Sequence, residues 1–163
     1  MPVTADLGTR PPRLGGVQPL TDPDEIARRS AEAMLGEDRA SAAAGIELVE
    51  VSPGRATVTM TVRDDMVNGH DIAHGGYVFL LADTAFAFAC NTYNQRTVAQ
   101  AAEIRFLAPT RLDDVLVARA VERSREGRDG TYDITVHAGD TLVAEFVGHS
   151  KQIRGTFFTD EEM

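Results

Sequence analysis

Residues His74–Cys90 read HGGYVFLLADTAFAFAC, and this stretch decides the fold. From Gly75 onward it would be apolar on every side of a helix, with one charge, Asp83, inside it. A helix that is hydrophobic all round is either a membrane span or the buried centre of a globular domain. A span needs about 20 apolar residues, and this run is shorter and has a carboxylate near its middle. We therefore predict a central helix surrounded by the rest of the chain.

Asp83 is the residue of this helix that needs an explanation. A carboxylate in apolar surroundings is costly unless it is paired or used, and desolvation raises its pKa. Such a group can act as a general base or attack an acyl carbon as a nucleophile. It can equally hydrogen-bond a neighbouring backbone group, in a network shared with Thr84. The composition of the helix leaves both alternatives open.

His74, Gly75 and Gly76 stand where this helix begins. Glycines allow a ligand to approach the backbone closely, and the first N–H groups of a helix have no partner within it. These donors suit a carbonyl oxygen that becomes an oxyanion. Asp83 follows Gly75 by eight residues, which is about 12 Å along a helix. One substrate carbonyl cannot touch both groups of one helix, so we predict a site shared by two subunits across a two-fold axis.

The totals limit the class of protein. The chain has 163 residues, of which 43% are hydrophobic and 25% charged, which indicates one globular domain. A net charge of −9 without a compact Lys/Arg run argues against nucleic acid as a partner. Cys90 is the single cysteine, which excludes an intrachain disulfide. Residues 1–20 lack the apolar core that a signal peptide has. We therefore expect a cytoplasmic protein without a membrane partner.

Four regions follow from the pattern along the chain. Residues 1–20 hold four of the seven prolines and are expected to be a flexible tail. Residues 21–45 are expected to be helical, residues 46–156 to form the main domain, and residues 157–163 to be a C-terminal tail.

Six segments with β-type patterns surround the central helix. Within residues 56–62, Ala, Val and Met alternate with Thr, and residues 131–138 alternate as cleanly. Short turns join consecutive segments, which implies antiparallel pairing, because parallel strands need long crossovers. The fold class expected is α+β, with an antiparallel sheet wrapped around one long central helix. The strands are predicted over residues 46–51, 56–62, 98–106, 115–123, 131–138 and 142–153.

Other chemical signals are weak. Asp65 and His70 have the D-x-x-x-x-H spacing of some hydratases, but their surroundings do not fit. His137 and His149 lie on predicted strands with no visible partner. The sequence has no zinc pattern, phosphate loop, nucleophile elbow or dinucleotide fingerprint. We expect no metal and no cofactor.

The segment Asn68–Asn91 has the pattern NGHxxxHGGxxFxLADTAFAxACN and resembles the hotdog-fold acyl-CoA thioesterases. It is most similar to the phenylacetic-acid-degradation subfamily, which hydrolyses hydroxyphenylacetyl-CoA. The resemblance covers residues 34–156 and includes VTMTV, IRFLAP and GHSK further along the chain. It implies that residues 46–156 are a hotdog thioesterase domain. It also implies that two subunits pair their sheets edge to edge, as a dimer or as a homotetramer built from two such dimers.

The resemblance assigns roles to single residues. Asp83 matches the catalytic carboxylate, and Gly75 matches the backbone N–H that polarises the thioester carbonyl. His74 and Asn68 match residues that line the site and help to hold the thioester or the water. The family takes its carboxylate and its glycine from opposite subunits, in agreement with the reach of one helix.

The expected substrate is an acyl-CoA, and CoA itself belongs to the substrate rather than being a cofactor. Gly76 and Thr84 are also expected to contact the substrate. The phosphates of CoA need local cations in an acidic protein. Arg111, Lys151 and Arg154 are the candidates, with solvated surface charge as the alternative for each.

The function expected is hydrolysis of aryl- or phenylacetyl-type CoA thioesters to a carboxylic acid and CoA. One alternative is a hotdog enoyl-CoA hydratase, and another is a non-catalytic acyl-CoA-binding hotdog protein. Tyr77, Phe79 and Phe86 could line an acyl pocket, but we expect them in the core.

Overall fold

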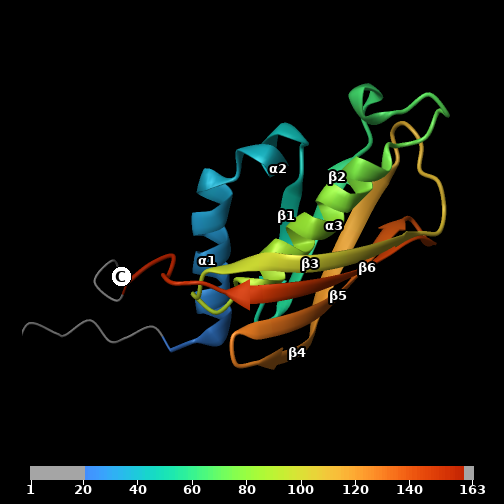
Figure 1. The fold of residues 1–163 in the computed structure, drawn as a ribbon. Helices are drawn as coiled ribbons and strands as arrows, with labels where there is room; N and C mark the ends of the chain where they lie inside the picture. The colour runs from blue at the N-terminus through green and yellow to red at the C-terminus, as the bar shows by residue number, and fades with distance from the viewer. Residues whose placement is uncertain (1–20, 160–163) are drawn as a thin grey trace, which may run out of the picture.

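In the computed structural model, which describes residues 21–159, a six-stranded antiparallel sheet curves around one helix (Figure 1). The helices are α1 (Pro23–Glu37), α2 (Arg39–Ala43) and α3 (Gly75–Cys90), with a 3₁₀ turn at Asp64–Met66. The strands are β1 (Glu47–Ser52), β2 (Arg55–Thr61), β3 (Thr97–Phe106), β4 (Val115–Glu126), β5 (Asp129–Ala138) and β6 (Thr141–Gln152). The predicted α+β class and antiparallel pairing are confirmed. The tail expected over residues 1–20 lies outside the described residues.

Helix α3 is the predicted central element. Nine of its residues, among them Leu81, Ala85 and Phe86, are buried, and the helix packs against β2, β4 and β5 on the concave face of the sheet. At its C-terminus the Asn91 amide donates to the carbonyls of Ala87 and Thr97, and so joins the helix end to β3. None of the helices in residues 21–159 combines the length and apolar content needed to cross a bilayer. The central buried helix is therefore confirmed.

One side of α3 lies away from the sheet. Leu80, Asp83 and Ala87 are only half-buried, and their spacing of three and four residues places them on one face of the helix. The sequence predicted an all-round apolar helix, and the structure covers only part of that surface.

The core follows from the period of two in the strands. Phe86 lies between Tyr132 and Phe146, with ring centroids 5.6 and 6.0 Å away. Gly148 in β6 lets the Phe86 ring approach, because a Cβ there would lie 2.8 Å from three ring carbons. Phe86 is fully buried, and Phe79 packs edge-on against Phe146. The expectation that Phe79 and Phe86 belong to the core is confirmed.

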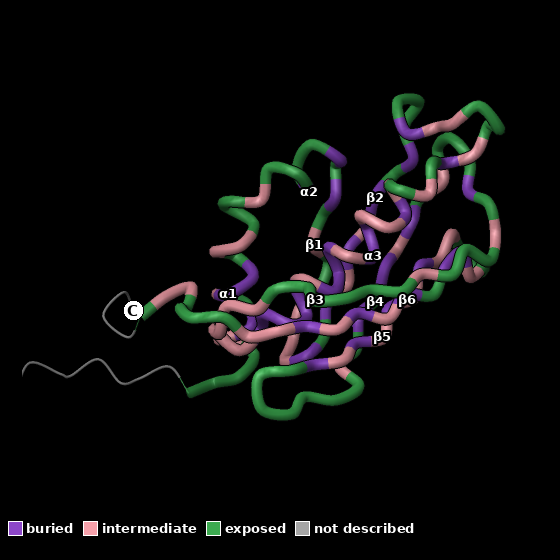
Figure 2. Tube along the Cα trace, viewed as in Figure 1, coloured by how far each residue is buried: buried purple, intermediate pink, exposed green. Residues whose placement is uncertain are grey.

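The strand order is β1-β2-β4-β5-β6-β3, so β3 forms one edge of the sheet and pairs only with β6. Figure 2 shows that β3 is exposed along most of its length. Because β5 and β6 lie between β3 and β4, the connection over residues 107–114 must cross the end of the sheet. It crosses at the end of the molecule where α3 begins (Figure 1).

The segments before and after the main domain also pack. The side chains of Ala27, Ser30 and Ala31 in α1 are buried, which confirms a helix in residues 21–45. At the other end, Asn94 Oδ1 accepts the N–H groups of Phe157 and Phe158 at 2.9 and 3.2 Å. The packed chain therefore continues past the boundary expected at residue 156.

Candidate active site

A folded loop brings Asn68 back to the start of α3. His74 N–H donates to the carbonyl of Met66 at 2.8 Å, and Val67 bridges Ala73. Asn68 holds the tip of this loop, since its Oδ1 accepts the N–H of His70 at 2.9 Å. This bond holds the side-chain amide of Asn68 in place. Its NH₂ group has no acceptor among the described residues.

His74 is the N-cap of α3. Its Nδ1 accepts the N–H of Gly76 at 2.9 Å, and its carbonyl accepts the N–H of Tyr77 at 2.9 Å. Nδ1 must be unprotonated to accept, so a neutral ring has its proton on Nε2. Among the described residues no acceptor is found for Gly75 N–H. Of the first three N–H groups of the helix, that of Gly75 is the one left for a ligand.

A hollow of about 380 Å³ opens beside this N–H group. The connection 107–114 forms one wall as it crosses the sheet, and the loop before α3 forms the other. The lining is mostly apolar, with Asn68, Gly75 and Thr110 as its polar members. The other lining residues are Ile72, Ala73, Val78, Phe106, Leu107, Ala108, Pro109 and Val143. The structure thus brings together Asn68 and Gly75, two of the predicted site residues.

Asp83 lies on the half-buried face of α3 and does not line this hollow. Burial raises the pKa of its carboxyl, and no opposite charge counters the shift. Within residues 21–159 the carboxylate has no hydrogen-bond or ion-pair partner. The alternative in which Asp83 bonds a neighbouring backbone group is therefore not realised in this chain. Cys90 offers no competing nucleophile, because burial raises the pKa of its thiol to about 12.

Gly75 and Asp83 both belong to α3, eight residues apart. The rise of a helix separates them by about 12 Å. Within one chain, a single carbonyl bound at Gly75 lies beyond the reach of Asp83.

The other predicted residues are spread over the molecule. Thr84 is buried, and its hydroxyl pairs with that of Ser41 in α2 at 3.1 Å. Thr84 does not line the hollow of its own chain. Arg111 lies beside the loop before α3 and donates to the carbonyl of Asp71 at 3.3 Å.

Lys151 and Arg154 lie beyond the far end of α3. Lys151 pairs with Asp129 at 2.8 Å, so its charge is already compensated. Arg154 lines a second hollow, of about 360 Å³, together with Arg128 and Gln95. Neither residue is near Gly75 of the same chain.

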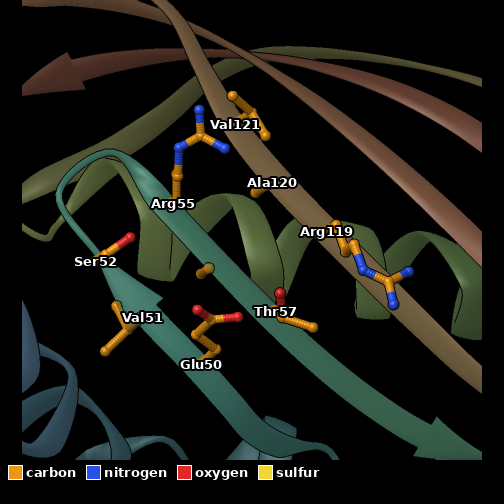
Figure 3. A pocket seen from close by; sticks show the side chains of 9 residues that line it. Glu50, Val51, Ser52, Arg55, Thr57, Arg119, Ala120 and Val121 are labelled. Carbon is orange, nitrogen blue, oxygen red and sulfur yellow. The ribbon is translucent and has the colours of Figure 1, made fainter.

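A third hollow, of about 200 Å³, lies over β1, β2 and β4. Figure 3 shows Glu50, Arg55 and Arg119 around it. None of the predicted site residues lines it, so it is separate from the candidate site.

Two residues of the site were not found from the sequence. The Phe106 ring lies close to Gly75, and Thr110, within the connection 107–114, accepts the N–H of Ala73 just before α3. Their available signal was the run IRFLAP, which carries the family resemblance: Phe106 lies in it and Thr110 follows it directly.

Comparison of the chain with known proteins identifies its family. Residues 70–145 match the thioesterase superfamily. The acyl-coenzyme A thioesterase PaaI of Escherichia coli K12 is 44% identical over 131 residues, which cover 80% of this chain and 94% of that protein.

Solved structures agree with the sequence comparison. The structure of the E. coli PaaI protein from the phenylacetic acid degradation operon has a TM-score of 0.81 and 42% identity. The match covers 83% of this chain and 99% of that one. A variant of PaaI from Thermus thermophilus has a TM-score of 0.69 and 35% identity. That match covers 71% of this chain and 100% of the Thermus chain. The chain therefore belongs to the thioesterase superfamily, and it is a thioester hydrolase with the hotdog fold.

Proposed function

We propose that the protein hydrolyses acyl-CoA thioesters, with an aryl or phenylacetyl-type acyl group, at a site completed by a second copy of the chain. The observation that supports this most directly is the pair of unused groups on α3. Gly75 offers an N–H without an acceptor and Asp83 a carboxylate without a partner, within residues 21–159. Their separation along one helix requires that they serve two different sites.

The open surfaces of the chain support a two-fold dimer. β3 is an edge strand, and an unpaired edge is a template for another strand. Beside it, the half-buried face of α3 with Leu80, Asp83 and Ala87 is left partly uncovered by residues 21–159. Antiparallel pairing of two β3 strands would set the two helices antiparallel. The start of one helix could then lie opposite Asp83 of the other.

The reaction at such a site balances without a cofactor. The thioester carbonyl oxygen accepts the N–H of Gly75, which stabilises the negative charge that develops there. Asp83 takes a proton from water as the water oxygen bonds to the carbonyl carbon. The C–S bond then breaks, the acid leaves with the new oxygen, and the proton that Asp83 took from the water passes to the CoA thiolate, which restores the Asp83 carboxylate. In this scheme His74 acts as the helix cap that keeps Gly75 N–H in position.

The acyl group is suggested by the hollow and by the relatives. A space of about 380 Å³ with mostly apolar walls suits an aryl or medium-length acyl group. The relatives are named as an acyl-coenzyme A thioesterase and as proteins of phenylacetic acid degradation. Arg111 is the predicted cation nearest the hollow of its own chain, while Arg154 could reach a CoA phosphate only across a dimer.

The hydratase alternative finds no support in the loop before α3. The Asp65 carboxylate pairs with Arg63 at 3.0 Å, and His70 is exposed. The two side chains therefore do not form a catalytic pair. A measurement of thiol release from acyl-CoA distinguishes the enzyme from the non-catalytic alternative.

The test is thiol release from phenylacetyl-CoA and hexanoyl-CoA by the wild type and by Asp83→Asn. We expect release by the wild type and a loss of several orders of magnitude in the variant. Asp65→Asn is the matched control, because it removes an exposed carboxylate outside the site. A wild type that binds acyl-CoA but releases no thiol would instead support the non-catalytic alternative.

A further inference from the structure

Thr110 is a buried hydroxyl without a partner. Its side chain is 2% exposed, and Oγ1 has no hydrogen-bond partner among the described residues. Thr110 also lines the hollow beside Gly75. Buried polar groups are nearly always satisfied, so such an atom calls for an explanation. A ligand atom in the hollow would provide one.

The backbone of Thr110 holds it close to the start of α3. Its carbonyl accepts the N–H of Ala73 at 2.8 Å, two residues before Gly75. Thr110 therefore lines the hollow on the side where its backbone is tied to the segment just before α3. The far walls are formed by apolar residues such as Leu107 and Val143.

An oxyanion is generally held by more than one donor, and the helix supplies only one here. Gly76 N–H is used by His74 Nδ1 and Tyr77 N–H by the His74 carbonyl, which leaves Gly75 N–H. A second donor must come from another element. Asn68 also lines the hollow with an unused NH₂ group, but Asn68 is half-buried and water can satisfy that group, whereas the Thr110 hydroxyl is buried and has no partner among the described residues.

We propose that the Thr110 hydroxyl donates the second hydrogen bond to the thioester carbonyl oxygen, together with Gly75 N–H. This inference rests on the proposed thioesterase function. It makes Thr110 a residue that touches the reacting carbonyl. Because the carbonyl is common to all substrates, Thr110 acts on every acyl group alike.

The experiment compares Thr110→Val, which keeps the shape and removes the hydroxyl, with Thr110→Ser, which keeps the hydroxyl. We expect kcat of Thr110→Val to fall about a hundredfold, as for the loss of one oxyanion donor. The fall should be the same for phenylacetyl-CoA and hexanoyl-CoA, with KM little changed, and Thr110→Ser should recover most of the rate. Ser30→Ala is the matched control, because Ser30 Oγ is also buried and unpartnered but lies on α1.

Stability separates this role from a structural one. Loss of a hydroxyl that has no partner should leave the Tm of Thr110→Val unchanged or higher. A lower Tm, an unchanged kcat, or a loss limited to one acyl group would overturn the proposal while the wild type remains a thioesterase. A wild type without thiol release would overturn the proposed function, and this inference with it.

Discussion

The ring of Phe106 lies directly over Gly75, so close that a Cβ on Gly75 would lie 3.1 Å from Phe106 Cζ. The two residues come from the end of β3 and the start of α3. The close approach needs glycine at this point, and it places an aromatic wall beside the free N–H. The ring is 55% exposed and can yield.

Gly75→Ala is therefore expected to fold but to lose activity. The added methyl group pushes the Phe106 ring into the hollow and displaces the carbonyl from the N–H, and a shift of about 1 Å can lower kcat/KM about a hundredfold. Gly75→Ala with Phe106→Ala should recover part of the loss, as measured by thiol release. Gly69→Ala, where nothing lies within 4 Å of the new Cβ, should retain full activity. An active Gly75→Ala enzyme would contradict the prediction.

The pH dependence of the reaction should reflect the burial of Asp83. Burial raises the pKa of this carboxyl, and a general base must be ionised to act. We expect kcat/KM to fall on the acid side at a pH clearly above about 3.9, the ordinary aspartate value. The measurement is a pH–rate profile with phenylacetyl-CoA. Asp65→Asn should leave the profile unchanged, since a hydrogen bond from Arg63 lowers the pKa of Asp65, and Asp65 does not line the hollow.

The same shift predicts an effect on stability. A carboxyl with a raised pKa binds its proton more tightly in the folded than in the unfolded chain. The free energy of unfolding therefore decreases as the pH rises from the ordinary value through the raised one. At neutral pH the Asp83→Asn variant should be at least as stable as the wild type while it loses activity. A clear decrease in its Tm at neutral pH would show that the Asp83 charge stabilises the fold.

Ala102 tests the assembly. It is an exposed residue in β3, opposite Gly148 of β6, on the open edge of the sheet. Ala102→Arg should add a charge where a second copy is proposed to pair, and so shift the protein to a monomer in light scattering. Activity should fall together with dimer formation, because each site would lose the Asp83 that the second copy supplies. Ala42→Arg on exposed α2 is the control, and a fully active monomer would contradict the shared site.

Replacing Glu122, which lies away from the candidate site, should lower the stability of the fold. Its Oε2 accepts the hydroxyls of Tyr93 at 2.9 Å and Tyr132 at 2.8 Å. Tyr132 is 1% exposed, so Glu122→Ala would leave a buried hydroxyl without an acceptor. We expect a loss of about 1–3 kcal/mol in the free energy of unfolding, measured in urea. Glu126→Ala, an exposed change in the same strand, should have little effect.

Much of the fold could be predicted because its causes are local. The apolar surface of residues 75–90 permits only a buried helix, and the alternation in residues 131–138 permits only a half-buried strand. Gly45 and Gly54 have φ of +68° and +70°. Gly45 stands at the end of the helical segment predicted over residues 21–45, and Gly54 stands between the strands predicted over residues 46–51 and 56–62. Helix and strand limits differ from the prediction by a few residues, as frayed ends do.

The candidate site was only partly predictable. Gly75 and Asp83 could be proposed as site residues from the sequence, because a charge and a glycine pair are unusual in an apolar helix. The contact between Thr84 and Ser41 could not be predicted, because sequence spacing does not show which side of a helix faces another element. Lys151 likewise pairs with Asp129, which comes from another strand.

The sequence by itself determined the central helix, the strands and the distance between Gly75 and Asp83, since these depend on residues near one another in the chain. Only the tertiary structure decided that β3 pairs with β6 at the edge, and that residues 107–114 cross over the start of α3. It also decided that Thr110 is buried there, with no partner for its hydroxyl among residues 21–159. These features depend on pairing between strands that are distant in the sequence. The pairing of lowest free energy is set by burial of the whole sheet and not by local conformational preference.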